Sequence, residues 1–471
     1  MGSLLNDIFY GQIFLAGERK QVKTVFRIVI YFIVCVIVVG GAGAAGFIHT
    51  MNAGMSTYDK SIPLFKNVEL PEYEASKPTV AVLLANDVTE VFDFLVPYEM
   101  FAMTGGYNVY SVAPDREVKS LTGGLDVIPH YSFSELDAML GKSPDIIVIP
   151  YMPILNEEKY APVRAWIQKH SGTETTLLSI CNGAENLADT GLLNGKSAAT
   201  HWGDINRLIS KYPDIQWVKD RRYVPQGNIV SSAGLTSGID ATLYVIAQQL
   251  GEPSAAKVAT EMNYPSYAYV NNPQMEPFVP ESSDITYVLN NAYQWNKVKA
   301  GVLLYNGVDE LDLSAAFDTY SASGTTTTLT VSSVNQPIVT KHGLNLIARY
   351  QMKNVPMLAK MIVVGSDAET TASDDIKQWN NSGSSAKLLL LHHNAENRFA
   401  MDPAFEDLSN QEDVGTAKFA AKRLEYRATD HLKLEGNSFA LEAFGVPILL
   451  GALSLIITFF IDRRFFRRIE R

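Results

Sequence analysis

The sequence predicts an α/β protein with two doubly wound, parallel-sheet domains set between two membrane-spanning helices. Three observations predict this class. Short apolar runs alternate with helix-like runs, as in a parallel sheet that helices cover on both faces. The second half of the chain repeats the first, and a long uncharged segment lies near each end.

The two uncharged segments span positions 28–48 and 444–461. Each is long enough to cross a bilayer as a helix, the second at the short end of the range. Pro447 is expected in the first turn of the second span, where a missing N–H costs least. A cleaved signal peptide is the alternative for the first segment, since "GGAGAAG" offers small residues for cleavage. The second segment would anchor the chain in either case.

Basic residues flank both segments on their outer sides. Four precede the first segment and five follow the second: Arg19, Lys20, Lys23, Arg27, Arg463, Arg464, Arg467, Arg468 and Arg471. The positive-inside rule therefore predicts a two-pass cell-membrane protein with cytoplasmic tails, residues 1–27 and 462–471, and extracytoplasmic domains. The tails favour contact with anionic membrane lipid, whereas the net charge of −11 argues against nucleic-acid binding through bulk charge.

A polar stalk is expected over residues 49–77, followed by a first domain over residues 78–268. Its strand-like runs are "TVAVLLA", "YNVYSVAP", "DIIVIP" and "TTLLSIC". Its helix-like runs are "FLVPYEMFAMTG", "APVRAWIQKHSG" and "GAENLADTGLL". The continuous apolar character of the strand-like runs is typical of buried parallel strands.

The second half of the chain repeats these runs. "AGVLLYNGVDELDLSAAFDTYSASG" resembles the start of the first domain, and Asp312 takes the place of Asp93. "LLLLHHNAENRF" resembles "LLSICNGAENLA", with His392 in the place of Cys181. We therefore expect a linker over residues 269–297 and a degenerate second domain over residues 298–435 that pairs with the first. Residues 412–432 are expected to form one strong helix that leads toward the second span.

Cys181 ends a strand-like run, and a helix-like run begins at Gly183. This arrangement is typical of a nucleophile elbow, at the edge of a parallel sheet where sites lie. Amides at the start of a helix stabilise an anion, which predicts a lowered thiol pKa. A buried cysteine that packs as a small hydrophobe is the alternative, and the spacing alone leaves both open. Cys35 lies in the first span, so the outer portion has no disulfide.

Four stretches carry a resemblance to a known family. They are "VFDFLVPYEMF", "LLSICNGAENLADTGLLNGKSAATHW", "YVPQGNIVSSAGLTSGIDATLYVIAQQLG" and the repeated start and elbow in the second half. They resemble the ThiJ/PfpI superfamily, in the branch shared by AraC-type regulators and isonitrile-hydratase-like enzymes. The resemblance is strong over residues 77–264 and weak over residues 297–427. It implies two flavodoxin-like domains with the class I glutamine-amidotransferase-like fold.

The resemblance also implies four catalytic residues: Cys181, Asp93, His201 and Asn182. Cys181 matches the nucleophile, and Asp93 matches the acid that hydrogen-bonds the sulfur and orients the thiolate or passes it a proton. His201 matches the histidine of the family's "TTHW" motif, and either pairs with the cysteine or only hydrogen-bonds within the core. Asn182 supplies a backbone N–H toward an oxyanion.

One departure from the family weakens the catalytic interpretation. Active members carry two glycines after the third strand, whereas this chain has Tyr151 and Met152, which are expected to crowd the space above Cys181. Two functions remain open: a cysteine-dependent hydrolase, lyase or hydratase acting on a small electrophile, and a sensor that binds a small molecule or registers oxidation of Cys181. A third interpretation is a membrane scaffold that keeps the fold without its chemistry.

The expected partners are a small-molecule ligand or substrate and membrane lipid, and further homo-oligomerisation stays open. No cofactor is expected, because the chain has no phosphate loop or dinucleotide fingerprint. No metal is expected either, because the eight histidines show no metal-like spacing apart from adjacent His392 and His393. Adjacent residues in an extended segment point in opposite directions.

Overall fold

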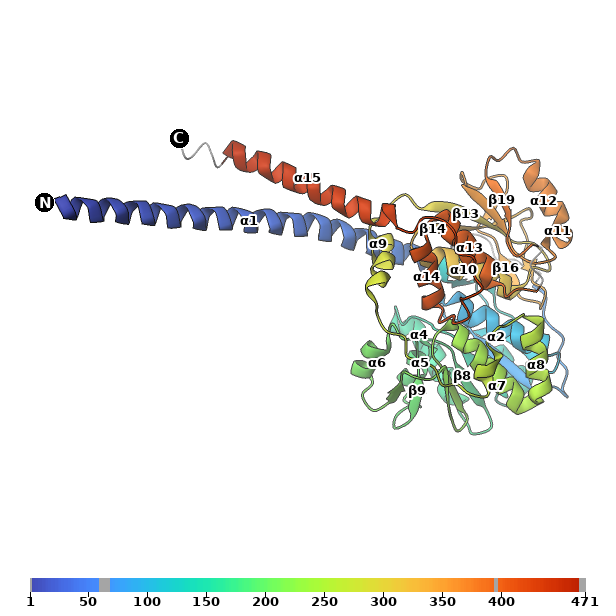
Figure 1. The fold of residues 1–471 in the computed structure, drawn as a ribbon. Coiled ribbons are helices and arrows are strands. Elements are labelled where there is room, and N and C mark those ends of the chain that lie inside the picture. The colour runs from blue at the N-terminus through green and yellow to red at the C-terminus, as the bar shows by residue number, and fades with distance from the viewer. Residues whose placement is uncertain (1, 59–67, 394–396, 466–471) are drawn as a thin grey trace. The chain divides into compact units, whose positions relative to one another are not determined.

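The computed structural model describes residues 2–58, 68–393 and 397–465 (Figure 1). The chain divides into two compact units. One combines Met1–Thr50, Val288–Trp295 and Leu441–Arg471, and the other combines Met51–Tyr287 and Asn296–Ala440. The second unit contains the sheets, and the predicted α/β class with parallel sheets is confirmed.

The first sheet has seven strands in the order β11-β12-β8-β7-β1-β3-β6, all parallel except the β11–β12 pair. The strands are β1 (Thr79–Leu83), β3 (Asn108–Ala113), β6 (Tyr131–Ser132), β7 (Ile146–Ile149), β8 (Thr176–Ser179), β11 (Tyr223–Gln226) and β12 (Ile229–Ser232). β9 (Ser197–Ala199) and β10 (Gln216–Val218) form a separate parallel pair.

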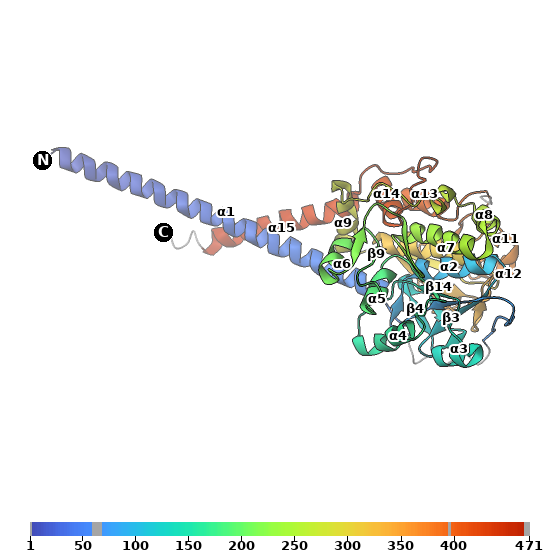
Figure 2. The same cartoon turned by 90° about the horizontal axis from the view of Figure 1, so that it is seen from below.

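Helices cover both faces of this sheet, as the continuous apolar strands require. Val80 and Val82 belong to one core cluster and Ala81 and Leu83 to another, because alternate residues of a strand face opposite sides. Figure 2 shows α3 and α4 on one side of the strands and α2 and α7 on the other. The helices are α2 (Val91–Met103), α3 (Phe133–Leu140), α4 (Glu157–Lys169), α5 (Gly183–Asp189), α6 (Ile205–Lys211), α7 (Leu235–Leu250) and α8 (Glu252–Glu261).

The second sheet has five parallel strands in the order β17-β14-β13-β18-β19. This order matches β6-β3-β1-β7-β8 strand for strand, and β11 and β12 have no counterpart in it. The strands are β13 (Val298–Leu303), β14 (Thr326–Ser332), β17 (Tyr350–Gln351), β18 (Lys360–Val363) and β19 (Lys387–Leu390). The helices that accompany them are α10 (Glu310–Tyr320), α11 (Ala368–Thr371), α12 (Ser373–Asn380), α13 (Met401–Gln411) and α14 (Val414–Arg423).

A third sheet, in the order β15-β16-β5-β4-β2, joins the two halves of this unit. Its strands are β2 (Val88–Thr89), β4 (Lys119–Leu121), β5 (Asp126–Ile128), β15 (Ile338–Val339) and β16 (Asn345–Ile347). β5 and β16 pair antiparallel with Val127 opposite Leu346, and the offset between these two residues equals that between Asp93 and Asp312. The joint is therefore nearly symmetric, like an interface between two copies of one chain.

Two predicted elements differ in the structure. The single helix expected over residues 412–432 is wrong: α14 ends at Arg423, and Glu425 has a φ of 55°. The expected linker contains helical segments, namely η2 (Tyr267–Val270), η3 (Ser282–Asp284) and α9 (Ile285–Tyr293). Two further 3-10 turns are η1 (Thr122–Gly124) and η4 (Ser321–Ser323).

The apolar segments form α1 (Gly2–Gly54) and α15 (Leu441–Phe465). By length and composition, Thr24–Gly54 and Leu441–Arg464 can each cross a membrane. Pro447 lies inside α15 rather than in the first turn of a helix, because α15 begins earlier than expected. The expected stalk is helical as far as Gly54, and its residues 59–67 lie outside the described residues.

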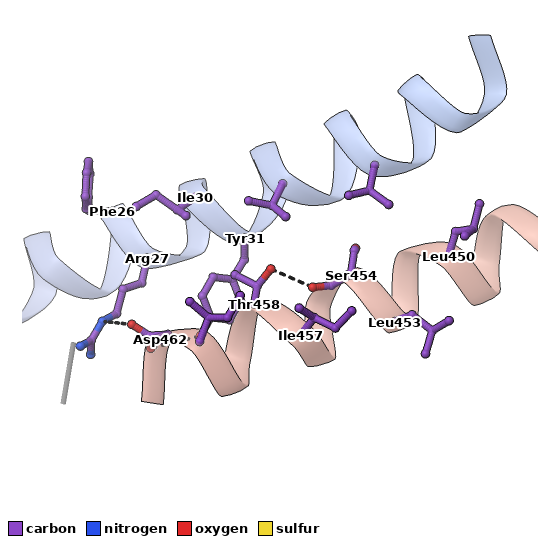
Figure 3. Close-up of a pocket in the computed structure, with 13 residues that line it drawn as sticks. Phe26, Arg27, Ile30, Tyr31, Leu450, Leu453, Ser454, Ile457, Thr458 and Asp462 are labelled. Atoms are coloured by element: carbon purple, nitrogen blue, oxygen red, sulfur yellow. Dashed lines mark hydrogen bonds and ion pairs between the residues drawn. The ribbon is translucent and has the colours of Figure 1, made fainter. Parts of the chain in front are cut away.

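The two apolar helices contact each other at polar groups near one end. The Asp462 carboxylate pairs with Arg27 Nε at 3.2 Å and accepts the Tyr31 hydroxyl at 3.1 Å. Figure 3 shows Arg27 directed at Asp462, beside a groove of about 660 Å³ with apolar walls that include Ile30 and Leu453. The Arg27–Asp462 pair therefore fixes the register of the two helices.

Candidate functional site

Cys181 occupies a sharp bend between β8 and α5. Its φ of 55° lies in the left-handed region, which is rare for residues other than glycine. Gly183 allows the close approach that the bend requires, since a Cβ there would lie 2.0 Å from the carbonyl oxygen of Ile149. The local sequence thus forms the elbow geometry, with strained backbone at the cysteine.

The sulfur of Cys181 is enclosed, and the residue is only 5% exposed. Burial raises the pKa of the Cys181 thiol well above its usual range, and the carboxyl groups of Asp93 and Glu90 raise it further. The backbone N–H of Asn182 hydrogen-bonds the thiol and lowers its pKa, but this effect is smaller. The prediction of a lowered thiol pKa is therefore wrong for the described state: the elbow holds a protonated thiol.

Asp93 lies in the first turn of α2 and is fully buried. Its Oδ2 accepts the N–H of Tyr151 at 3.1 Å, and its Oδ1 has no hydrogen-bond partner among the described residues. Burial and the neighbouring Glu90 raise the pKa of Asp93 well above its usual range. The expected hydrogen bond from Asp93 to the Cys181 sulfur is not among the contacts of the described residues, although the two groups lie close enough to interact electrostatically.

Glu90 caps α2 and connects Asp93 to the other half of the unit. Its Oε2 accepts the N–H of Asp93 at 2.7 Å. Burial and the charge of Asp318, on α10, raise the pKa of Glu90 to about 8. Arg423, at the end of α14, forms an ion pair with Asp318. A row of ionisable groups therefore extends from the half-buried Arg423 through the buried Asp318, Glu90 and Asp93 toward the thiol.

Leu424 and Glu425 cover the elbow from the second half of the unit. The Thr236 N–H donates to the Leu424 carbonyl at 3.0 Å. The Glu425 carbonyl accepts the Thr236 hydroxyl at 2.8 Å and Arg222 Nη1 at 3.1 Å. Three donors of the first half therefore hold this short segment in place, and the positive φ of Glu425 lets the chain turn into the contact.

Glu425 is 0% exposed, and its side chain also lies beside the elbow. Its Oε2 accepts the Ser237 hydroxyl at 2.6 Å, and its Oε1 has no hydrogen-bond partner among the described residues. Gly234 leaves room for it, since a Cβ at that position would lie 2.5 Å from the Glu425 carboxyl carbon. The charge of Glu425 also raises the pKa of the Cys181 thiol, so this carboxylate lies near the elbow.

The other two predicted residues have mainly structural contacts. His201 Nε2 donates to the Arg423 carbonyl at 2.9 Å, and its Nδ1 accepts the Gly203 N–H at 3.2 Å. Both ring nitrogens are thus engaged by backbone, which supports the alternative of a core hydrogen bond over a Cys–His pair. The Asn182 side chain donates to Asp204 at 2.6 Å and accepts the Thr200 hydroxyl at 3.0 Å.

Tyr151 and Met152 differ in what they do at the elbow. The Tyr151 carbonyl accepts the Glu90 N–H at 2.8 Å, and burial raises the pKa of the Tyr151 phenol. Met152 packs in the core cluster on the other face of the sheet, and Asn186 bonds both of its backbone groups. Met152 therefore does not crowd the thiol, contrary to expectation, and the crowding expected from Tyr151 stays a prediction.

A small cavity borders the covered elbow. It has a volume of about 290 Å³, and its walls include Thr200, Trp202, Phe278 and Glu425. Trp202 Nε1 and Glu425 Oε1 are both buried without a hydrogen-bond partner among the described residues. An unpartnered donor and an unpartnered acceptor beside apolar walls suit a small polar molecule or an ordered water.

The second sheet repeats the bend with a different residue. His392 has a φ of 69°, and its Nδ1 lies 2.8 Å from Oδ1 of Asp312. Burial lowers the pKa of His392, but the hydrogen bond to Asp312 outweighs it and the pKa is raised overall. His392 Nε2 donates to the Arg398 carbonyl at 2.9 Å, so both ring nitrogens are engaged.

Sequence reasoning missed four residues of the site: Glu90, Asp318, Arg423 and Glu425. Glu90 could have been noticed as an acid just ahead of Asp93 at the start of a helix, at the spacing of a cap. The other three come from the second half of the unit. No local pattern indicates that they reach the elbow.

The model of the DJ-1/PfpI family matches residues 78–248. The isonitrile hydratase of Pseudomonas putida is 28% identical over 178 residues, which cover 36% of this chain and 72% of the hydratase. The HTH-type transcriptional regulator CdhR of Pseudomonas aeruginosa is 33% identical over 109 residues, which cover 22% of this chain and 32% of the regulator.

Two solved structures are also similar. A DJ-1 superfamily protein of Salmonella typhimurium is 24% identical with a TM-score of 0.35, covering 40% of this chain and 99% of that protein. Drosophila melanogaster DJ-1beta is 18% identical with a TM-score of 0.34, covering 39% of this chain and 96% of that protein.

Proposed function

Because the model of the DJ-1/PfpI family matches residues 78–248, we propose that this chain is a membrane-anchored DJ-1/PfpI protein that binds or senses a small molecule. In the described state its elbow cysteine is closed. The observation that carries the proposal is the cover over Cys181. Leu424 and Glu425 accept hydrogen bonds from donors of the first half, beside a buried, protonated thiol. A resting enzyme needs an accessible nucleophile, whereas a sensor needs a closed state that a signal can open.

We further propose that residues 298–435 are a degenerate second copy of the domain. The shared strand order and the near-symmetric β5–β16 joint support this. The second copy would act as the cover, since Arg423, Leu424 and Glu425 all belong to it. In this proposal the two copies imitate a dimer in which one member closes the site of the other.

The proposed location is a two-pass membrane protein with both tails in the cytoplasm and both domains outside. The two apolar helices and the basic residues beyond them support it. In this proposal a signal from the domains passes through a membrane partner or a lipid contact. Oxidation of Cys181 to a sulfenic or sulfinic acid is one form the signal can take.

A cysteine-dependent enzyme is the second candidate function. The similarity to isonitrile hydratase and the proximity of Cys181 to Asp93 favour it. In this case the Cys181 sulfur would add to the electrophilic carbon of the substrate, while Asp93 would give its proton to the substrate and take up the proton that the thiol loses. The Glu425 cover would first have to leave the elbow.

One experiment separates the two functions. The full-length protein in detergent, with Cys35→Ser so that Cys181 is the only thiol, is incubated with a simple isonitrile and in parallel with dilute peroxide. Absence of formamide product together with selective oxidation of Cys181 is the expected result. Catalytic turnover that disappears in Cys181→Ser would replace the proposal with the enzyme. Cys181 inert to both reagents would reject oxidation sensing and the enzyme alike.

A further inference from the structure

A second cluster of ionisable side chains lies away from Cys181, where the two halves of the unit meet. Glu99 comes from α2, Glu310 begins α10, and His342 follows β15. One carboxylate or imidazole atom from each residue lies within 4.8 Å of the others. Glu99 and Glu310 are 3% and 0% exposed, so both carboxyl groups are withdrawn from water.

The cluster borders a cavity of about 340 Å³. Glu99 and His342 line it, together with Asp309, Lys341 and His392 among others. Its volume leaves space for several water molecules next to the cluster. A cation bound there would therefore have an entry path and positions for ligands from solution.

The packing between the two halves does not require these charges. Val91 and Gly123 hold the places in the first half that are equivalent to Glu310 and His342, at the same offset that relates Asp93 to Asp312. In the first half, these two positions of the near-symmetric joint are filled by the apolar side chain of Val91 and by Gly123, which has no side chain. A buried carboxylate costs free energy unless it is compensated, so Glu310 and His342 suggest a use that the fold itself does not supply.

Glu99 also lacks the cationic partner that its equivalent has. Asp318 is the equivalent of Glu99 at this same offset, and it is paired with Arg423. Glu99 instead accepts the Leu311 N–H at 2.5 Å and hydrogen-bonds the Asp309 carboxyl group, and the Glu310 carboxyl lies close to it. No cationic side chain of the described residues forms an ion pair with it. Three neighbouring acids therefore meet at this place, and a bound cation would stabilise their charged forms.

Neighbouring groups already hold two of the three side chains in position. Glu310 Oε1 accepts the Thr340 hydroxyl at 2.5 Å and the His342 backbone N–H at 3.2 Å. The Tyr98 hydroxyl donates to the His342 carbonyl at 2.8 Å. Such supporting hydrogen bonds orient the ligands of metal sites.

We propose that Glu99, Glu310 and His342 bind one divalent transition-metal ion, Zn²⁺ or Mn²⁺, with its remaining coordination positions open to the cavity. One imidazole and two carboxylates form a donor set that these ions accept. Binding replaces the contact between Glu310 and His342, and protons are released as the metal enters because metal ligands must be deprotonated. The ion would link the two halves of the unit independently of the state of Cys181.

The test uses the full-length protein without an affinity tag, stripped with a chelator and titrated calorimetrically with Zn²⁺ and with Mn²⁺ in two buffers of different ionisation enthalpy. The double variant Glu310→Val with His342→Gly carries at both positions the residues that the first half has there, Val91 and Gly123. The packing of the joint should therefore be conserved. His431→Ala is the matched control, because His431 pairs with Asp402 and does not line the cavity.

We expect one equivalent of at least one of the two ions to bind with proton release. The double variant should weaken binding by more than about 100-fold, beyond the loss typical of supporting residues, while His431→Ala leaves it unchanged. If the double variant does not fold, Glu99→Gln is the substitute, because its amide oxygen still accepts the Leu311 N–H. The proposal is overturned if the parent protein binds neither ion stoichiometrically. It is also overturned if the parent and the variant bind the ion with equal affinity.

Discussion

Ser237 donates its hydroxyl to the carboxylate of Glu425 across 2.6 Å, which joins the first half of the unit to a residue far later in the chain. This hydrogen bond is the side-chain part of the cover over Cys181. Its partners are both buried, so it is protected from competition by water. The accessibility of the thiol therefore depends on a contact between the two halves.

Glu425→Gly tests the cover. Glycine adopts the positive φ of residue 425 without strain, so the backbone turn is kept while the carboxylate is removed. We expect Cys181 to be alkylated by iodoacetamide roughly tenfold faster, because a charge that raises its pKa and part of its cover are lost. The rate is measured by mass spectrometry in a Cys35→Ser background. Glu435→Gly, at an exposed position, is the control, and equal rates in both variants would contradict the cover.

Glu90→Gln tests the buried acids through pH. Because the pKa of Glu90 is raised from 4.5 to about 8, the folded state holds its proton more tightly than the unfolded state. Its contribution to stability is thus complete below pH 4.5 and is lost as the pH rises through about 8. The substituted amide carries no charge, so we expect the variant's melting temperature, relative to the parent, to rise between pH 5 and pH 8.5.

The control for this prediction is Glu174→Gln at an exposed position, for which the difference from the parent should stay constant with pH. Differential scanning fluorimetry at both pH values gives the comparison. A pH-independent difference for Glu90→Gln would mean that Glu90 is ionised in the folded protein.

Arg349→Met tests the joint between the two halves. Arg349 binds Asp126 through Nε at 2.6 Å and Nη2 at 2.9 Å, and Asp126 is fully buried. Removal of the guanidinium leaves an uncompensated buried carboxylate, so we expect a loss of about 3 kcal/mol in the free energy of unfolding. Lys377→Met, which breaks the exposed pair with Asp374, should cost less than about 1 kcal/mol.

Urea unfolding followed by tryptophan fluorescence measures both variants. Asp126→Asn added to Arg349→Met should recover part of the loss, because the unpaired charge is then gone. Equal stabilities of Arg349→Met and Lys377→Met would contradict the assigned role of the pair.

Gly451→Cys tests the pairing of the apolar helices. A Cβ at Gly451 would lie 3.6 Å from Sγ of Cys35, so a mild oxidant should join the two thiols in a Cys181→Ser background. Gly445→Cys, which has no neighbour within 4 Å, is the matched control. Asp462→Ala should reduce the cross-link several-fold, because it removes the partner of both Arg27 and Tyr31. Cross-linking is read from the shift on a non-reducing gel after protease cleavage of the domain segment.

Local patterns determined the elements of this protein. The apolar runs at residues 79–85, 145–150 and 175–181 predicted parallel strands, since a strand buried on both faces must be apolar throughout. The bend at Cys181 followed from its place between a strand and Gly183, whose missing side chain makes room for the Ile149 carbonyl. The repeated runs in the two halves likewise anticipated the related order of the two sheets.

Only the tertiary structure decided the state of the thiol. The sequence suggested ionisation by helix amides, but burial and the carboxyl groups of Asp93, Glu90 and Glu425 act the other way. The helix expected through residue 432 ends at Arg423, because Thr236 and Arg222 bind the carbonyl groups that follow it. Strands and bends follow from neighbours in the chain, whereas a pKa follows from neighbours in space, and here one of those is a carboxylate from the other half of the unit.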